Sequence, residues 1–372
     1  MVDVFEAVSK KEIKTFIKFP FKLYKNNPYW VPPIIKQELD TFDKTKNPAF
    51  NNATARFFLA KKQNKIVGRI AVIINWKEVN EQQKKKVRFG WLDMIDDIEV
   101  TKALMSKVYE IGKVHQLEYA EGPVGFSNMD KAGMLIHGFD KISNMTTFYN
   151  HAYYPEHLKK LDFNDGAHWV EYHFDTPDKL SDKVIKMASL IKQRYQLNVL
   201  RFKSIKRLLP YTEAMFDLMN RSYKVLQSFV PIPQEDIPYY KEKYIKFLHP
   251  DYVILITDAN NELIAFAIMM PSFAKALQKA NGKLFPFGFL QLMKAMKKND
   301  TVNFYLIGIA PEYQNKGIPS IIFEEALKKL KEKGVKYAET NPELEENKAV
   351  QSLWKHFDPV LVKRWKTFTK EL

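Results

Sequence analysis

Apolar and polar positions divide the chain into short strands and amphipathic helices, and two stretches are patterned to fold back on themselves. Residues 56–74 read RFFLAKKQNKIVGRIAVII, with two apolar runs on either side of Gln63 and Asn64. Residues 252–270 read YVILITDANNELIAFAIMM and repeat the arrangement around an Asn-Asn pair. Apolar, β-branched runs on either side of a short polar turn are typical of β-hairpins. The pattern predicts two hairpins about two hundred residues apart, a spacing that fits a duplicated domain better than a solenoid.

The order of predicted elements after the two hairpins is the same. A strand, a helix, a strand, a short helix and a final strand follow each hairpin. The segments that carry this match are VRFGWLDMI (87–95), LEYAEGPV (117–124), HLKKLDF (157–163) and HWVEYHF (168–174) in the first copy, and VNFYLIGI (302–309), VKYAET (335–340), SLWKHFD (352–358) and VLVKRWKTF (360–368) in the second. This alternation predicts the α/β (α+β) class, with two tandem domains that each contain a mixed, mostly antiparallel sheet flanked by helices.

The repeat also sets the expected domain boundaries. Residues 1–176 and 198–372 are expected to form the two domains, and a helical stretch within 177–197 is expected to join them. A chain of 372 residues suits two domains, on the usual prior of about 100 to 200 residues each. Two unrelated α/β domains that only look alike are the alternative to a true duplication.

Composition narrows the chemistry that the chain can perform. It has no cysteine, which excludes disulfides, cysteine-ligated metal clusters and an enzyme thioester. Its eight histidines show no HExxH or comparable spacing, so we expect no metal site. No apolar run is long enough for a signal-peptide core or a membrane span, and we therefore expect a cytoplasmic protein without stable membrane insertion.

The formal charge of +15 is unevenly distributed along the chain. Residues 1–175 carry 26 Lys and Arg against 22 Asp and Glu, whereas the remainder carries 32 against 21. The second half is therefore the better candidate for an anionic partner, such as a phosphorylated cofactor, a nucleic acid or a membrane surface.

A turn between a strand and a helix of the second copy carries groups that can bind an anion. The strand NFYLIGI ends before APEYQNKG, and a helix begins near Ile318 with Pro319 and Ser320 in its first turn. First-turn amides lack partners within the helix and lie at the positive end of its dipole, so they attract phosphate. Gly317 allows close approach of the backbone, and Lys316 adds a positive charge.

The matching turn of the first copy has the opposite chemistry. It reads MIDDIEVTKAL, and Asp96, Asp97 and Glu99 stand where the second copy has Gln314 to Gly317. Three carboxylates without a glycine would repel a pyrophosphate. The contrast indicates that only the second copy is built to hold an anion.

The turn of the second copy resembles a motif of a known family. Gln314-Asn315-Lys316-Gly317-Ile318-Pro319 is similar to the pyrophosphate-binding Q/R-x-x-G-x-G/A motif of the GCN5-related N-acetyltransferase (GNAT) superfamily, except that Pro319 replaces Gly or Ala and removes one amide donor. EENKAVQSLWKHF (345–357) resembles the later N-x-x-A-x-x-L-Y helix of that fold. In this helix Asn347 and Leu353 match, whereas Val350 replaces Ala and Trp354 replaces Tyr. The resemblance covers essentially residues 198–372, and a weaker version covers the first half, which implies a tandem GNAT protein.

This resemblance implies a substrate and a set of site residues. In the GNAT fold an acyl-CoA lies where the fourth and fifth strands separate, so acetyl-CoA or a longer acyl-CoA is expected as a substrate, with a small amine or peptide as acceptor. A backbone amide near Ile309 would stabilise the oxyanion. The residues implied to contact the cofactor are Ile309, Ala310, Gln314, Asn315, Lys316, Gly317, Ile318, Pro319, Ser320, Asn347 and Trp354.

Direct attack by an amine needs a base for the amine and an acid for the departing thiolate. Glu339 and Asn341, at the end of the fifth strand, are the catalytic candidates, although Glu339 also fits a surface charge or an ion pair. Trp354 holds the place of a Tyr that often serves as the acid in the family, and an indole N–H cannot supply a proton. Asn347 fits either a cofactor contact or a helix cap.

Three further segments are candidates for substrate contacts. The polar loop GFSNMDKAG (125–133) fits a substrate loop or a plain surface loop. The segment NNPYWVPP (26–33) fits a pocket wall or an extended segment packed on the core. FAKALQKANGKLFPFGFLQLMKAMKK (273–298) interrupts the second copy and fits a lid over an apolar acyl chain, a membrane-touching helix, or a helix docked on its own domain.

Three functions are compatible with these residues. The first is an N-acyltransferase that acts through the second domain, with the first domain helping to form the acceptor site. The second is a catalytically inactive double-GNAT protein that binds an acyl-CoA or another anion. The third is a Fem-like transferase, which alone would use tRNA, and no DNA partner is expected.

Overall fold

The computed structural model describes residues 1–127, 129–224, 229–245 and 247–372. The first half of the chain contains the strands β1 (Asp3–Glu6), β2 (Ala53–Lys62), β3 (Lys65–Asn75), β4 (Lys86–Met94), β5 (Tyr119–Gly122), β6 (Met134–His137) and β7 (Asn164–Asp175), and the helices α1 (Lys10–Leu23), α2 (Ile35–Thr41), α3 (Trp76–Asn80), α4 (Ile98–Val114) and α5 (Tyr153–Lys160).

The second half repeats this content with insertions. Its strands are β8 (Asn198–Leu200), β9 (Val253–Thr257), β10 (Leu263–Pro271), β11 (Thr301–Ile309), β12 (Tyr337–Thr340), β13 (Glu343–Leu344) and β14 (Val360–Glu371), and its helices are α6 (Asp182–Arg194), α7 (Ile205–Leu208), α8 (Thr212–Tyr223), α9 (Ile237–Ile245), α10 (Ala274–Ala280), α11 (Gly288–Lys297), α12 (Ile318–Glu332) and α13 (Lys348–Trp354).

One continuous sheet runs through both halves of the described chain. Its strand order is β1-β2-β3-β4-β5-β14-β7-β12-β11-β10-β9-β8, and β6 and β13 pair at the side of this path. Only the pairs β4–β5 and β11–β12 are parallel among the described strand pairs. The predicted class, a mixed and mostly antiparallel sheet flanked by helices, is therefore confirmed.

Both predicted hairpins are present. The strands β2 and β3 pair from Ala53↔Asn75 to Lys62↔Lys65, and the turn residues Gln63 and Asn64 have φ angles of 47° and 60°. The strands β9 and β10 also pair antiparallel, and Asn261 in their turn has a φ of 62°. Asn tolerates this left-handed conformation better than most residues, which explains why polar amides mark both turns.

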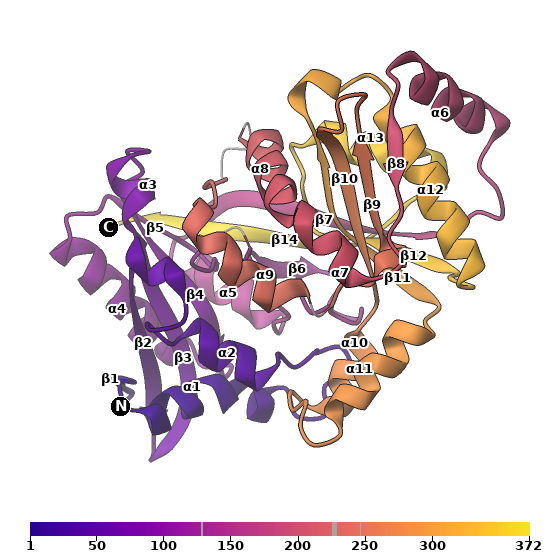
Figure 1. The fold of residues 1–372 in the computed structure, drawn as a ribbon. Coiled ribbons are helices and arrows are strands. Elements are labelled where there is room, and N and C mark those ends of the chain that lie inside the picture. The colour runs from indigo at the N-terminus through magenta and orange to yellow at the C-terminus, as the bar shows by residue number, and fades with distance from the viewer. Residues whose placement is uncertain (128, 225–228, 246) are drawn as a thin grey trace.

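The two halves exchange their last strands. β14, the end of the chain, pairs with β5 of the first half, and β7 of the first half pairs with β12 of the second. Figure 1 shows β14 in yellow, crossing from the second half into the sheet of the first. The sequence repeat starts again near residue 177, but the sheet does not divide there.

The hydrophobic cores follow the same exchange. Phe368 of β14 is fully buried in the core of the first half, beside Leu104 and Val108 of α4. Phe174 of β7 is buried in the core of the second half, with Phe304 and Trp354. A large aromatic side chain from each half therefore completes the core of the other, which ties the stability of one half to the other.

Candidate active site

The strands β11 and β12 separate halfway along β11. Their parallel register extends from Thr301↔Tyr337 to Phe304↔Thr340, and the amide of Asn341 makes a last bond to the carbonyl oxygen of Phe304 at 2.9 Å. Pro342 then lacks an amide to continue the ladder, and β13 pairs with β7 instead. On its other side β11 stays paired with β10 as far as Ile309. One edge of β11 is therefore open after Phe304.

A cavity of about 250 Å³ lies in this gap. The second half lines it with Tyr223, Phe229, Phe304, Tyr305, Leu306, Ile307, Asn341, Pro342, Glu343, Leu344, Asn347, Val350 and Trp354. The first half lines it with Lys86, Arg88, Glu121, Val124, Ser127, Ala132 and Trp169. The cavity thus lies between the two halves, and neither half alone encloses it.

The open edge of β11 presents alternate backbone groups to the cavity side. The amide of Ala310 donates to the carbonyl oxygen of Ile264 in β10 at 2.8 Å, so Ile309 and Ile307 direct their amides and carbonyls the other way. Tyr223 and Ser222, at the end of α8, donate their hydroxyls to the carbonyl oxygens of Ile307 at 3.0 Å and Ile309 at 2.9 Å. Of the two predicted contacts on this strand, Ile309 faces the gap, whereas the amide of Ala310 is used within the sheet.

The predicted anion turn lies at the end of β11 and begins α12. Gly317 precedes the helix with a φ of 77°, and Pro319 stands in its first turn. Among the described residues, no hydrogen bond is recorded for the backbone amides of Asn315, Gly317 and Ile318. The amide and hydroxyl of Ser320 both donate to the carbonyl oxygen of Gly317, at 3.0 and 2.8 Å. Three amides are therefore available to an anion, while Ser320 stabilises the turn.

Neighbouring side chains fix the shape of this turn. Gln314 donates its amide to the carbonyl oxygen of Ile309 at 3.2 Å. The ammonium of Lys316 lies 5.2 Å from the ring centre of Tyr195 and 5.1 Å from that of Tyr313, which orients its charge over two aromatic faces. A Cβ atom at Gly317 would lie 2.4 Å from Ile191 of α6, so glycine is required both for the positive φ and for the packing of α6.

The polar groups of the matching turn in the first half are paired with other groups of the first half. Asp97 is the N-cap of α4, where its side chain accepts a bond from the amide of Glu99 at 3.0 Å. Lys62 forms an ion pair with Asp97 at 2.7 Å, and this bond lowers the pKa of the carboxyl. Asp96 lies 3.1 Å from a ring nitrogen of His157. Carboxylates occupy this helix start, as the sequence contrast predicted, and one of them already binds the amides.

Glu339 lies outside the lining of the cavity. Its carboxylate accepts a bond from Asn303 at 2.7 Å and lies 3.9 Å from a ring nitrogen of His173. Burial alone would raise the pKa of Glu339, but the neighbouring His173, the charge of Lys363 and the bond from Asn303 together outweigh burial and lower it. This geometry matches the ion-pair alternative. Asn341 does line the cavity, where its side-chain oxygen accepts a bond from Thr146 at 2.8 Å.

Glu343 is a carboxylate of the cavity that the sequence did not single out. The indole N–H of Trp354 donates to its Oε1 at 2.5 Å, and its Oε2 is buried with no hydrogen-bond partner among the described residues. Burial raises the pKa of Glu343 to about 8, against a smaller lowering effect of the bond from Trp354. A buried indole needs an acceptor, so Trp354 in the place of Tyr is the sequence signal that a polar acceptor lies nearby.

Asn347 serves as a helix cap and also borders the cavity. Its Oδ1 accepts a bond from the amide of Val350 at 3.3 Å, at the start of α13. Trp354, at the other end of α13, is almost fully buried and packs against Phe304. The helix α13 therefore places Asn347 and Trp354, two positions of the N-x-x-A-x-x-L-Y motif, on the wall opposite the open edge of β11.

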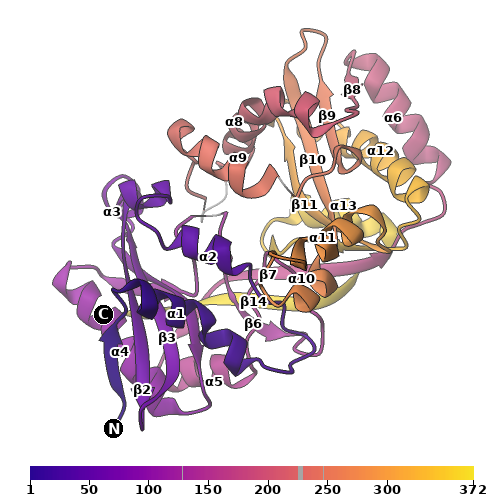
Figure 2. The same ribbon diagram turned by 60° about the horizontal axis from the view of Figure 1, so that its bottom comes forward.

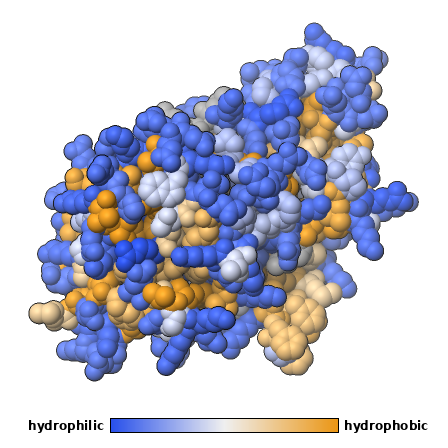
Figure 3. All heavy atoms as spheres, turned by 60° about the vertical axis from the view of Figure 1, so that its left-hand side comes forward, coloured by the Kyte–Doolittle hydropathy of each residue, from blue (hydrophilic) through white to orange (hydrophobic). Residues whose placement is uncertain are grey.

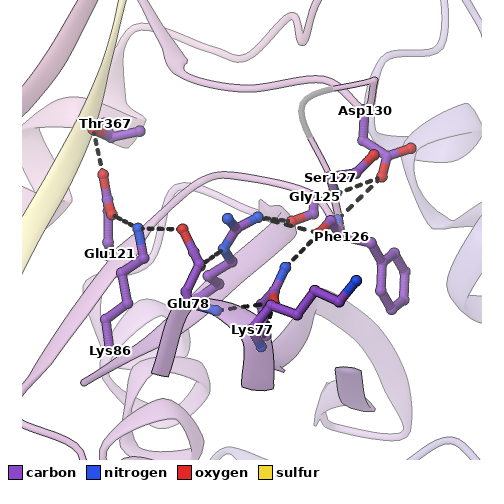
Figure 4. A network of polar contacts seen from close by, with 11 residues as sticks. Lys77, Glu78, Lys86, Glu121, Gly125, Phe126, Ser127, Asp130 and Thr367 are labelled. Atoms are coloured by element: carbon purple, nitrogen blue, oxygen red, sulfur yellow. Dashed lines mark hydrogen bonds and ion pairs between the residues drawn. The ribbon is translucent and has the colours of Figure 1, made fainter. Parts of the chain in front are cut away.

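The wall from the first half is a network of paired charges (Figure 4). Glu78 of α3 lies 2.6 Å from Arg88 and 3.0 Å from Lys86, and Lys86 also reaches Glu121 at 2.7 Å. Burial would raise the pKa of Glu78, but the Arg88 and Lys86 charges outweigh it and lower the pKa. Arg88 also donates to the carbonyl oxygen of Gly125 at 2.8 Å. The network thus fixes the polar loop at 125–133 against the sheet.

The same loop is bonded to the second half. Asp130 accepts bonds from the amides of Phe126 and Ser127, each at 3.1 Å. Tyr240 of α9 donates to the Ser127 hydroxyl at 3.0 Å, and Tyr244 donates to the carbonyl oxygen of Met129 at 2.7 Å. Ser127 and Ala132 line the cavity, so the described residues of this segment, 125–127 and 129–133, contribute to the cavity wall.

The described residues contain no cluster of three or more His, Cys, Asp or Glu side chains arranged to hold a metal ion. Within the same part of the chain, none of the helices is long and apolar enough to cross a bilayer.

Comparisons with known proteins agree with this geometry. Residues 212–358 match the model of the acetyltransferase (GNAT) family. Protein YghO of Escherichia coli (strain K12) is 25% identical over 371 residues, which cover 98% of this chain and 94% of that protein. The bacterial ceramide synthase of Caulobacter vibrioides (strain NA1000 / CB15N) is 21% identical over 316 residues, or 84% of this chain and 82% of that protein.

A solved structure has the same double architecture. The tandem GNAT protein from the clavulanic acid biosynthesis pathway superposes with a TM-score of 0.57 at 11% identity, over 100% of this chain and 98% of that one. The split strands, the helix-start turn and these matches define a protein with two GNAT folds in tandem. Residues 212–358 match the acetyltransferase (GNAT) family, and the chain as a whole has the fold of a tandem GNAT protein. The fold implies an acyl-CoA as co-substrate.

Proposed function

We propose that this protein transfers an acyl group from acyl-CoA to an amine in the cavity between its two halves. The observation that carries this proposal is the split between β11 and β12. It places an open strand edge and a carboxylate with a raised pKa around one cavity, and the turn with three available amides follows the same strand at the start of α12. Each of these groups has a separate task in acyl transfer.

The second half supplies the binding site for CoA. The free amides of Asn315, Gly317 and Ile318 and the charge of Lys316 suit a pyrophosphate. The open edge of β11 suits the amides of a pantetheine arm, which can pair with it as an added strand. A carbonyl oxygen has two lone pairs, so Ile307 can accept a bond from pantetheine and keep the hydroxyl of Tyr223.

Glu343 is the proton carrier of the proposed reaction. The amine nitrogen attacks the thioester carbon, and the free Oε2 of Glu343 accepts the proton that the nitrogen loses. The amide of Ile309 faces the gap and stabilises the oxyanion that forms. The carbon–sulfur bond then breaks, the new amide remains, and Glu343 returns the proton to the thiolate. A carboxyl with a pKa of about 8 suits both proton transfers, from the amine and to the thiolate.

The first half forms the wall on the acceptor side. Its charges are mutually paired, so Lys86, Arg88 and Glu121 offer a polar surface without an excess of either sign. An amine with hydroxyl or amide groups nearby suits such a wall. The name of the Caulobacter relative, a ceramide synthase, supports an amine acceptor, because ceramide is an amide of a fatty acid.

Release of the CoA thiol in the presence of amines tests the proposal. Acetyl-CoA and octanoyl-CoA are incubated with the protein and with separate amines, including a long-chain amino alcohol, spermidine, glucosamine and a lysine peptide. Thiol release should depend on one class of amine and should fall about 10²- to 10⁴-fold in Glu343→Gln. The matched control Glu346→Gln changes an exposed carboxylate of the same segment and should retain activity. Equal rates in the wild type and Glu343→Gln would remove Glu343 from the mechanism.

An acyl-CoA-binding protein without catalysis is the second candidate. The observation that favours it is Trp354, which occupies the place of the usual Tyr and cannot donate a proton. The same assay separates the two functions. Saturable binding of acetyl-CoA or octanoyl-CoA without thiol release from any amine would select the binding protein.

A further inference from the structure

A second cavity lies directly behind the open edge of β11. It has a volume of about 60 Å³, and its lining exposes only apolar surface. Its walls come from α8, α9, β10 and β11, and are formed by Met129, Thr212, Met215, Phe216, Met219, Tyr240, Lys241, Tyr244, Ile245, Leu248, Phe266, Ile268, Tyr305 and Leu306. Tyr305 and Leu306 line this apolar chamber and also the cavity of the candidate active site.

The position of the chamber matches the tail of an acyl donor. A thioester held at the Ile309 amide would direct the acyl tail along β11 toward Tyr305 and Leu306, the two residues that the cavities share. An acetyl group is too short to reach these residues. We propose that the chamber receives a few methylenes of the hydrocarbon tail of an acyl-CoA longer than acetyl-CoA, an inference that rests on the proposed function.

The chemistry of the lining supports a flexible apolar ligand. Met129, Met215 and Met219 are unbranched and adapt to the shape of a partner. Each methylene that enters an apolar pocket adds to affinity, since its surface leaves water. Two of the tyrosines of the lining donate their hydroxyls to the loop of the first half, Tyr240 to the Ser127 hydroxyl and Tyr244 to the carbonyl oxygen of Met129. The chamber therefore offers ring faces instead of hydroxyls.

Calorimetric titration with acetyl-CoA and octanoyl-CoA tests the chamber. The wild type should bind octanoyl-CoA at least about tenfold more tightly than acetyl-CoA. Met215→Trp fills the chamber and should abolish this preference while it keeps the affinity for acetyl-CoA. Val114→Trp, at an exposed site on α4, is the matched control and should keep the preference.

The possible results distinguish a failure of the chamber proposal from a failure of the proposed function. Equal affinity for the two esters in the wild type, or an unchanged preference in Met215→Trp, overturns the chamber and leaves acyl-CoA binding intact. Absence of binding for every CoA ester overturns both. If circular dichroism shows that Met215→Trp is unfolded, Met215→Ala replaces it. This variant enlarges the chamber and should favour dodecanoyl-CoA over octanoyl-CoA more than the wild type does, and no change would overturn the chamber.

A different observation concerns the surface of α10, α11 and their connection, here named the apolar lobe (residues 274–297). Phe285 is 86% exposed and Phe287 is 72% exposed, and Phe289, Leu290 and Met293 are also exposed. Figures 1 and 2 place α10 and α11 where the two halves of the molecule meet. Figure 3 shows apolar side chains gathered at the lower right edge, at the height at which Figure 1 draws the connection between α10 and α11. Scattered single apolar residues are normal on a surface, but a group of five within nine positions is not.

The apolar lobe is held firmly on its inner side. Leu277 and Leu292 are buried in a cluster with Val31 and Ile34, which belong to the first half. Gln278 donates to the carbonyl oxygens of Pro28 and Trp30, at 2.8 and 3.0 Å. The amide of Ile35 donates to the carbonyl oxygen of Gly282 at 3.0 Å. The docked-helix alternative is thus correct for the inner face, and the outer aromatic side chains are presented on a fixed support.

Lysines accompany these exposed side chains. Lys283, Lys294, Lys297 and Lys298 are exposed, and the described part of the apolar lobe carries no carboxylate. Aromatic side chains that enter the headgroup region, with lysines beside them, suit a membrane surface that carries negative charge. We propose that the apolar lobe docks on an anionic bilayer, at the interface and without a membrane span.

Sedimentation with phospholipid vesicles tests the docking. The protein should sediment with vesicles of phosphatidylcholine mixed with phosphatidylglycerol, less with phosphatidylcholine alone, and less at high salt. The double variant Phe285→Ser, Phe287→Ser should bind the mixed vesicles at least about tenfold more weakly. Val114→Ser removes an exposed apolar side chain from α4 and should bind as the wild type does. Absence of binding by the wild type overturns the docking. Dimerisation of the wild type that the double variant abolishes would also overturn it, since the partner would then be a second copy.

Discussion

At the scale of single residues, the site depends on how each polar group is already used. Gly317 could be predicted from the sequence because glycine adopts the positive φ before α12 without strain. Glu343 could not, since its raised pKa comes from burial, which sequence spacing does not reveal, and the bond from the Trp354 indole only partly offsets it. Glu339 is the carboxylate that the sequence favours instead, but the structure bonds it to Asn303 outside the cavity lining.

The pH dependence of activity follows from Glu343. The carboxyl accepts a proton only when ionised, and burial raises its pKa from the ordinary value of 4.5 to about 8. We expect kcat/KM to rise with pH through about 8 and then level off. Glu343→Gln should lose this rise, and a profile that is flat between pH about 6 and 9 in the wild type would contradict the role.

The same group affects stability in the opposite direction. A folded-state pKa above the unfolded value favours the protonated carboxyl, so its contribution is complete below pH 4.5 and is lost as pH rises through about 8. We expect the free energy of unfolding of Glu343→Gln to rise relative to the wild type as pH increases over this window. Urea unfolding at a series of pH values measures the difference, and parallel curves would argue against a buried Glu343.

Charge at the turn before α12 should control CoA binding. Lys316→Glu places a carboxylate beside the three free amides and should weaken acetyl-CoA binding by at least about tenfold, since like charges repel at short range. Lys11→Glu makes the same change on α1 and should have no effect. Loss of affinity to the same extent in both variants would mean that net charge, not the turn, attracts CoA.

At the scale of elements, periodicity gave the strands but not their partners. Both hairpins and the order of helices and strands could be predicted, because local apolar patterns report them directly. The exchange of β7 and β14 could not, since each strand has the alternation expected of either sheet. The open edge of β11 also depends on this exchange. The chain after β12 forms β13, and β13 pairs with β7 instead of continuing beside β11.

Phe368 tests the exchange directly. It belongs to the last strand but is fully buried in the core of the first half. Phe368→Ala should lower the free energy of unfolding by about 3 to 5 kcal/mol, and amide exchange should increase in α4. Val360→Ala, at an exposed position of the same strand, should change stability by less than about 0.5 kcal/mol. Faster exchange confined to the second half would contradict the exchanged arrangement.

At the scale of the whole molecule, the two halves share one cavity. The second half keeps the turn that suits an anion, while Asp97 closes the equivalent helix start of the first. The first half instead supplies a wall of paired charges and the loop at 125–133. The sequence contrast between the two turns predicted that only the second half has a turn suited to an anion. Only the fold shows that the two halves share a cavity.

The structure of the protein with bound octanoyl-CoA, determined by crystallography, tests the central claim most directly. The account predicts a pyrophosphate on the amides of Gly317 and Ile318, a pantetheine arm along the open edge of β11, and a thioester oxygen within hydrogen-bonding distance of the Ile309 amide. Glu343 should face the thioester from the opposite wall. A CoA molecule bound at the start of α4, or away from the gap between β11 and β12, would contradict it.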